Sequence, residues 1–168
     1  MAKVVLKLGS DISTDDIYPG RFMATVLPTE TPQFAFADYP VNAKLKAGEI
    51  PKGSVIVAGQ NFGCGSSREQ AASTLKGYDL VVVAKGFARI FLQNSCNLGL
   101  RTVICPGIEA SESDELEAGE TEVANLTTGK RFAITPLPPA RQAIIDAGGL
   151  IAYTRKRLME KHGIPAGA

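Results

Sequence analysis

Histidine is nearly absent from this sequence, and tryptophan is absent altogether. The one histidine, His162, stands six residues before the C-terminus, where a terminal helix is expected to fray. A histidine general base needs a fixed imidazole, and most catalytic zinc sites need two or three of them. The sequence therefore argues against both kinds of site, and any chemistry must depend on other side chains.

Cysteine is also scarce, and its spacing does not suit a metal site. Cys64, Cys96 and Cys105 are 32 and 9 residues apart, without the close Cys-x-x-Cys pairs of zinc and iron–sulfur sites. We therefore expect free thiols and no metal or cofactor bound by this chain. Cys96 and Cys105 are interpreted as small buried residues, whereas Cys64 lies in a glycine-rich turn.

A charge excess and a long hydrophobic run are lacking as well. Eighteen Lys and Arg oppose seventeen Asp and Glu, which argues against nucleic acid as a partner. The longest obvious apolar run, residues 80–84, is far shorter than the roughly 20 residues of a membrane span, and no signal-peptide pattern opens the chain. We expect a cytoplasmic protein without a membrane partner, with residues 1–168 forming one domain.

Strand and helix patterns alternate through the middle of the chain. Residues 4–8, 54–58, 80–84 and 101–105 are apolar and rich in β-branched side chains, which predicts strands. Helices are expected at 66–76 and from Phe87 to Leu98, the second ending at Gly99. Consecutive β-α-β units with apolar strands predict an α/β fold with a mostly parallel sheet.

The segments outside this β-α-β region are predicted to form a long excursion, a hairpin and two C-terminal helices. Residues 19–53 hold five of the ten prolines and are expected to form a long excursion with one short helix after Thr31. Residues 121–126 and 130–135 flank a short Thr-Thr-Gly loop and predict an antiparallel hairpin. Two helices are expected before and after Gly148.

The strongest candidate site is residues 61–69, Asn-Phe-Gly-Cys-Gly-Ser-Ser-Arg-Glu, between a predicted strand and helix. Gly63 and Gly65 permit backbone conformations that expose amide hydrogens in a concave turn, and a helix start adds positive potential. This pattern predicts anion binding. Ser66 and Glu69 also have the spacing of a capping box, which would satisfy the same amides without any function. Both interpretations stand on the pattern alone.

Arg68 favours the anion-binding interpretation, because a guanidinium offers the two-point grip that carboxylate and phosphate require. The Gly-Lys-Ser/Thr ending of a P-loop is missing, so a carboxylate is favoured over a nucleotide. Ser66 could serve as a base only if neighbouring amides and cations stabilised its alkoxide.

Two further polar clusters follow predicted strands. Asp11, Asp15 and Asp16 do not have calcium-loop spacing and are interpreted as a polar turn, although convergent loops could bring Asp15 to Arg68. Lys85 and Arg89 are interpreted as solvated surface residues.

Three segments, residues 9–20, 61–70 and 84–91, resemble in order and spacing the small subunits of 3-isopropylmalate dehydratase, in the aconitase superfamily. The resemblance implies a swivelling β/β/α domain of the aconitase C-terminal type. It also implies a separate large subunit that carries a 4Fe-4S cluster, a cytoplasmic location, and a hydroxy-dicarboxylate substrate isomerised by dehydration and rehydration in leucine biosynthesis.

The resemblance also implies roles for individual residues. Ser66 matches the general base, Ser67 and Arg68 match ligands of a substrate carboxylate, and Asp15 matches a supporting acidic position. The supporting turn consists of Gly63, Cys64 and Gly65.

We expect the substrate to be selected by a specificity loop that consists of Phe22, Met23, Ala24 and Thr25. Homoaconitase-type relatives resemble Tyr-Leu-Arg-Thr there, and Ala24 lacks the cation that would hold a third carboxylate. Isopropylmalate is favoured, while a methylmalate, a dimethylmalate or homoaconitate remain alternatives. A carboxylate-binding regulatory module and a structural interaction protein are the alternatives that are not enzymes.

Overall fold

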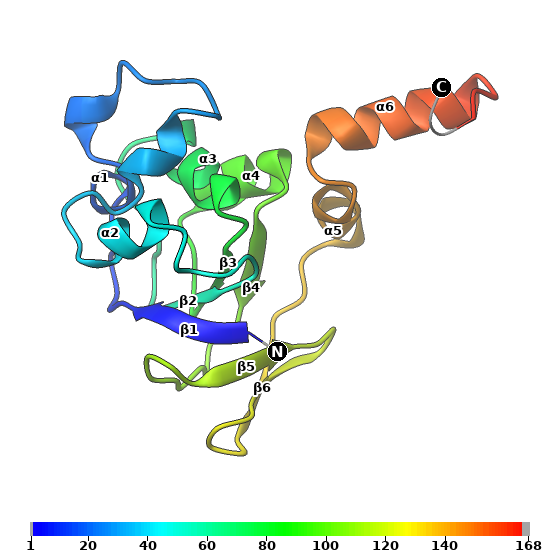
Figure 1. Cartoon of the computed structure of the whole chain (residues 1–168). Helices are drawn as coiled ribbons and strands as arrows, with labels where there is room; N and C mark the ends of the chain where they lie inside the picture. The colour runs from blue at the N-terminus through cyan, green and yellow to red at the C-terminus, as the bar shows by residue number, and fades with distance from the viewer. Residues whose placement is uncertain (1, 166–168) are drawn as a thin grey trace.

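The computed structural model describes residues 2–165 of the chain (Figure 1). Its strands are β1 (Ala2–Lys7), β2 (Val55–Ala58), β3 (Val81–Ala84), β4 (Arg101–Ile104), β5 (Glu115–Ala118), β6 (Glu122–Asn125) and β7 (Arg131–Ala133). Its α-helices are α1 (Thr14–Ile17), α2 (Val41–Lys46), α3 (Glu69–Gly77), α4 (Arg89–Leu98), α5 (Pro139–Asp146) and α6 (Leu150–Lys161). Two 3₁₀ helices, η1 (Gly20–Phe22) and η2 (Thr31–Phe34), lie between α1 and α2.

The strands form one mixed sheet in the order β4-β3-β2-β1-β5-β6-β7. Strands β1 to β4 are parallel, with Val55 opposite Val81 and Val81 opposite Arg101. Strands β5, β6 and β7 are antiparallel to their neighbours. The predicted α/β fold with a mostly parallel sheet and an antiparallel hairpin is confirmed, and β5 is an addition to it.

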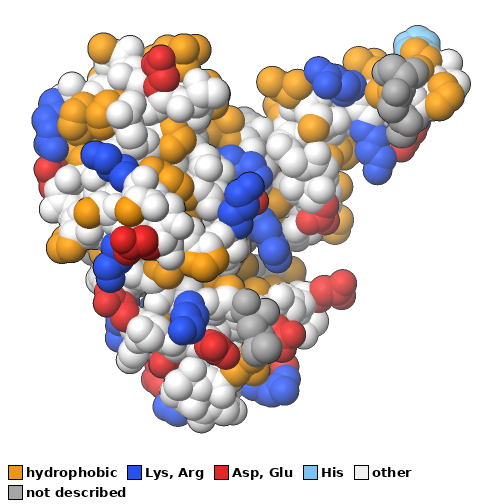
Figure 2. Space-filling model, viewed as in Figure 1, with side chains coloured by type: hydrophobic (Ala, Val, Ile, Leu, Met, Phe, Trp, Pro, Cys, Tyr) orange, Lys and Arg blue, Asp and Glu red, His pale blue; other side chains and the backbone are white. Residues whose placement is uncertain are grey.

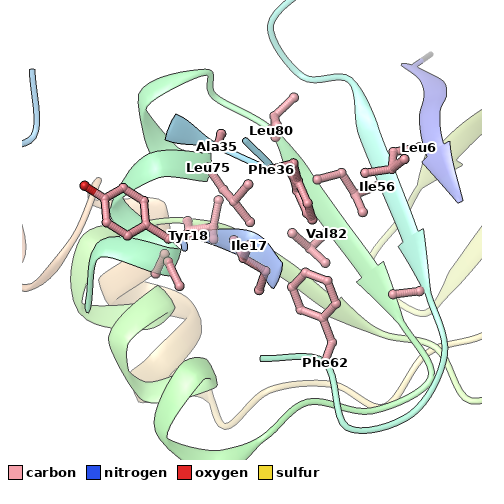
Figure 3. Packing of buried hydrophobic residues seen from close by; sticks show 14 of the residues in the cluster. Leu6, Ile17, Tyr18, Ala35, Phe36, Ile56, Phe62, Leu75, Leu80 and Val82 are labelled. Atoms are coloured by element: carbon pink, nitrogen blue, oxygen red, sulfur yellow. The ribbon is translucent and has the colours of Figure 1, made fainter. Parts of the chain in front are cut away.

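Alternating side chains of the parallel strands enter two separate cores. Ile56 and Val82 point into a cluster with α1, α2, α3 and α4, which lie over one face of the sheet (Figures 1 and 3). Val55, Val57 and Val81 point the other way, into a cluster with residues of β5, β6 and the segment after β4. Because both faces are covered, the central strands β2 and β3 are apolar and buried along their whole length rather than alternating with polar residues.

The second core exists because the sheet curls back on itself. Thr135, just after β7, pairs with Ile104 at the end of β4, and its amide donates to the Ile104 carbonyl at 2.8 Å. Cys105 is fully buried at this junction, and burial raises the pKa of its thiol. The interpretation of Cys96 and Cys105 as buried free thiols is confirmed.

The excursion after α1 contains more structure than the sequence indicated. The expected single helix after Thr31 is the 3₁₀ helix η2, and η1 and α2 are additional elements. Phe22 stacks on Phe34 with ring centroids 4.1 Å apart, and both rings pack against the first core. The excursion is thus a packed cover over the helical face, because its aromatic side chains are drawn into that core.

Helices α5 and α6 project from the body of the molecule (Figures 1 and 2). No residue of α6 is buried, and large apolar side chains, among them Ile151 and Leu158, are exposed along it. Between residues 2 and 165 we find no helix that combines the length and the hydropathy needed to cross a membrane.

Candidate active site

Three loops meet where β1, β2 and β3 end, because the carboxyl ends of parallel strands lie at one edge of the sheet. The loop after β2 lies between the other two and pairs with both. The Gly63 amide donates to the Ile12 carbonyl at 2.7 Å, and the Phe62 amide donates to the Gly86 carbonyl at 3.0 Å. Phe62 is fully buried beneath this loop and makes edge contacts with Phe87 and Phe91. The motif at 61–69 is therefore fixed by backbone hydrogen bonds to both neighbouring loops and by the packing of Phe62 in the core.

The acidic segment after β1 is a helix rather than the expected polar turn. Helix α1 starts after Ser13, whose Oγ accepts from the Asp16 amide while the Asp16 carboxylate accepts from the Ser13 amide at 2.8 Å. This is a capping box, and the Ser-x-x-acid spacing that indicates one was present in the sequence. The box orients α1 so that Thr14 and Asp15 face the 61–69 loop.

The predicted helix start at Ser66 is wrong. Helix α3 begins at Glu69, its N-cap is Arg68, and no side chain caps it, so Ser66 and Glu69 do not form a capping box. Gly63 and Gly65 have φ of 83° and 97°, and such positive φ values interrupt a right-handed helix. After this turn the backbone is still extended at Arg68, with φ −62° and ψ 112°, so the helix starts only at Glu69 and the Ser66 side chain does not cap it.

Exposure separates the members of the motif. Gly65, Ser66 and Ser67 are exposed, and Cys64 is half-buried. The Arg68 side chain is 19% exposed, so most of it is packed while part of the guanidinium still reaches solvent. Two hydroxyls and a partly screened cation are thus presented on an open surface, which is the chemistry expected for a carboxylate-binding half-site.

Arg68 is held by α1 and by the residues that follow it. Its Nη1 donates to Asp15 Oδ1 at 2.6 Å and to the Tyr18 carbonyl at 3.2 Å. The same Asp15 oxygen accepts from the Gly20 amide at 2.7 Å. The predicted approach of Asp15 to Arg68 is confirmed. Within residues 2–165, Nη2 of Arg68 makes no hydrogen bond, and it lies against Gly20.

The hydrogen bond from Arg68, and after it the Gly20 amide, lower the pKa of Asp15 below its ordinary value of 3.8. Both partners favour the ionised carboxylate, so the contact stabilises the fold above pH 3.8 and is lost as the pH falls from there through the lower, native value. We expect the difference in unfolding free energy between wild type and Asp15→Asn to be constant from neutral pH down to this range and then to vanish. Urea denaturation as a function of pH measures it.

Glu109→Gln is the matched control for this variant, because Glu109 is also an exposed carboxylate whose pKa a cation, Lys130, lowers. Only Asp15→Asn is expected to weaken the binding of a carboxylate at this site, since Glu109 lies outside it. If the difference in unfolding free energy between wild type and Asp15→Asn persisted unchanged in strong acid, the ionised Asp15 carboxylate would not be its cause.

Tyr18 holds residues 22–25, the predicted specificity loop, in place. Its ring is fully buried (Figure 3). Its hydroxyl shares one proton between the Phe22 carbonyl at 3.0 Å and the Thr25 carbonyl at 3.2 Å. Burial raises the pKa of this phenol, which keeps it protonated as a donor. Met23 and Ala24, between the anchored carbonyls, are exposed. The sequence analysis missed Tyr18, because nothing in its local pattern indicates a contact with residues four and seven positions later.

Other candidate groups are not gathered at this site. Lys85 and Arg89 are exposed at the end of β3 and the start of α4, as expected for solvated residues. Cys96 and Cys105 are buried in different parts of the molecule, and Cys64 alone belongs to the loop. In the described part of the chain, no three metal-ligating side chains come together in a group that could hold a metal ion or cluster.

Comparisons with known proteins identify the same family that the sequence motifs resemble. The family described as aconitase C-terminal domain matches residues 10–106. The 3-isopropylmalate dehydratase small subunit of Moorella thermoacetica is 41% identical over 89% of this chain and 92% of its own. The isopropylmalate/citramalate isomerase small subunit of Methanocaldococcus jannaschii is 44% identical over 93% and 94%. A solved structure of 3-isopropylmalate dehydratase from M. jannaschii superposes with a TM-score of 0.86 at 35% identity and covers 96% of each chain.

Proposed function

Because this chain belongs to the aconitase C-terminal domain family, we propose that it is the small subunit of a heteromeric 3-isopropylmalate dehydratase. This hydro-lyase interconverts 2-isopropylmalate and 3-isopropylmalate by losing and re-adding water, a step of leucine biosynthesis. Support comes from relatives of that name that align with nearly the whole chain. In this proposal residues 1–168 act as one swivelling domain in the cytoplasm and close over the large subunit.

The observation that carries the proposal is the open surface formed by Ser66, Ser67 and Arg68. The two serines are exposed, and the guanidinium is oriented by Asp15 with its Nη2 edge unused within residues 2–165. A surface of this kind can bind a carboxylate but cannot exclude water from it. A second surface must cover the ligand, which agrees with a large subunit that completes the site.

In the proposed reaction, Ser66 acts as the general base. Its alkoxide takes a proton from the carbon next to the one that carries the hydroxyl, and the C–H bond breaks as the O–H bond forms. The electron pair becomes the double bond of the unsaturated intermediate while the C–O bond breaks and the hydroxyl leaves with its bonding electrons. The Ser67 hydroxyl and the Arg68 guanidinium hold a substrate carboxylate in place. The 4Fe-4S cluster expected in the large subunit would supply a Lewis acid for the hydroxyl. Rehydration on the adjacent carbon returns the proton from Ser66.

Reconstitution tests this proposal. The purified chain alone is expected to be colourless and inactive, and isomerase activity is expected when the cluster-bearing large subunit is added. Activity of the chain alone would contradict the shared site. A regulatory module would bind 3-isopropylmalate without turnover in the reconstituted pair, which would contradict the enzymatic proposal.

The substrate is the finer part of the proposal. Isopropylmalate is the first candidate, and a methylmalate is the second, because the M. jannaschii relative is named for citramalate as well. Rates with both acids and with homocitrate, measured on the reconstituted pair, rank the candidates. A third carboxylate has no cation at position 24, so homocitrate is expected to be the poorest of the three.

Ala24→Arg is expected to raise the ratio of kcat/KM for homocitrate to that for isopropylmalate by about 10- to 100-fold, the range of one charged hydrogen bond. Ala24 is exposed on the segment that Tyr18 anchors, so the longer side chain can be accommodated. Ala24→Gln is the control, because it adds length without charge. An equal effect of both substitutions would assign the change to size rather than to the cation.

A further inference from the structure

The Thr14 side chain lies directly against the serine that we propose as the base. Thr14 is only 2% exposed, and its Oγ1 lies 3.1 Å from the Ser66 carbonyl oxygen and 3.3 Å from Ser66 Oγ. Its backbone is fixed, because the Thr14 amide donates to the Cys64 carbonyl at 2.8 Å and the Ser13 capping box starts α1 at this residue. The hydroxyl is therefore held at the base of the exposed Ser66 side chain.

Counting protons assigns a direction to these two contacts. The Ser66 carbonyl can only accept, so Thr14 must donate its single hydroxyl proton to it. The contact between the two hydroxyl oxygens then needs the Ser66 proton, with Ser66 as donor and Thr14 as acceptor. An alkoxide at Ser66 has no proton to donate. The contact with an alkoxide can persist only if the Thr14 hydroxyl rotates away from the carbonyl and donates to Ser66 Oγ instead.

We propose that Thr14 is a positioning residue whose hydroxyl rotates between these two acceptors and so stabilises the Ser66 alkoxide. The inference rests on the proposed role of Ser66 as general base. Thr14 keeps its own proton throughout, and only the direction of its O–H bond changes. This arrangement makes the alkoxide accessible nearer to physiological pH, because a hydrogen bond to a charged oxygen is stronger than one to a neutral oxygen.

Other charged groups near this hydroxyl pair belong to the elements packed around the loop. Helix α1 carries Asp15 and Asp16, α4 begins at Arg89, and the loop and the start of α3 carry Cys64, Arg68 and Glu69. Asp15 is paired with Arg68, and Asp16 with the Ser13 cap. Thr14 is thus the neutral donor in contact with Ser66 Oγ, and it can be removed without deleting a charge.

Thr14→Val tests the inference in the reconstituted enzyme, because valine keeps the shape and removes the hydroxyl. We expect kcat at neutral pH to fall about 10- to 100-fold, corresponding to a rise of one to two units in the pKa that limits the rate on the acid side. Raising the pH is expected to recover the loss, and Thr14→Ser is expected to retain the wild-type profile. Thr74→Val is the control, since Thr74 is also fully buried and donates to a carbonyl, that of Thr31, at 2.8 Å.

The outcomes separate this inference from the proposed function. An unshifted pH profile in Thr14→Val, with activity still dependent on Ser66, would overturn the role of Thr14 alone. A loss at every pH, matched by the loss in Thr74→Val, would reduce Thr14 to a structural contact and would also overturn it. Full activity of Ser66→Ala would instead remove the proposed base itself.

Discussion

Replacing Ser66 with alanine is expected to lower kcat of the reconstituted enzyme by about 10²- to 10⁴-fold, the usual contribution of a general base. The Ser66 side chain is exposed and caps no helix, so its removal should leave folding and subunit assembly unchanged. Steady-state kinetics with saturating substrate measures the loss. Co-purification with the large subunit checks that assembly is retained.

Ser73→Ala is the matched control for this experiment. Ser73 also places its hydroxyl near a threonine hydroxyl, that of Thr31 at 3.2 Å, but on α3 and away from the loop. It is expected to keep full activity. If Ser66→Ala retained wild-type turnover, another group would have to remove the proton, and Ser66 would be only a part of the binding surface.

Replacing Gly63 with alanine is expected to cost about 2–5 kcal/mol of unfolding free energy and to displace the 61–69 loop. Two penalties add at this position. A residue with a side chain at a φ of 83° is strained by about 1–2 kcal/mol, and a Cβ would lie 2.2 Å from Phe91 Cγ and 2.5 Å from its Cβ, an overlap worth about 1–3 kcal/mol. Phe91 is packed against Phe62 and has little room to move. Urea denaturation measures the loss.

Gly65→Ala separates these two penalties. Gly65 also has a positive φ, 97°, but the nearest atom to a Cβ there is Thr14 Oγ1 at 3.6 Å, an ordinary contact. Only the strain of about 1–2 kcal/mol is expected. Equal losses in the two variants would show that the contact with Phe91 adjusts without cost, and a Gly63→Ala protein of wild-type stability would contradict the geometry of the loop.

Some parts of the site were predictable from sequence because their signals are local. The Gly-Cys-Gly-Ser-Ser-Arg segment indicated a turn with an arginine beside it, and the structure places both at the edge of the sheet. The start of α3 was predicted three residues too early, because Ser66 and Glu69 have the spacing of a capping box. The extended backbone of Arg68, with φ −62° and ψ 112°, instead delays the helix to Glu69. The same spacing at Ser13 and Asp16 does cap a helix, since the residues directly after Ser13 are helical.

The amino-acid sequence was enough to predict the family, the residues of the 61–69 motif and every described strand except β5, because β-branched runs and the contiguous Gly-Cys-Gly-Ser-Ser-Arg segment are local signals. The side chains that support this motif could be identified only from the three-dimensional packing. Asp15 and Arg68 are 53 positions apart, and Thr14 and Ser66 are 52 apart. Their contacts arise because parallel pairing of β1 with β2 brings both strand ends to one edge, and the α1 capping box then turns Thr14 and Asp15 toward the loop. Side chains this far apart in the sequence come into contact through strand pairing, and no local sequence pattern predicts such a contact.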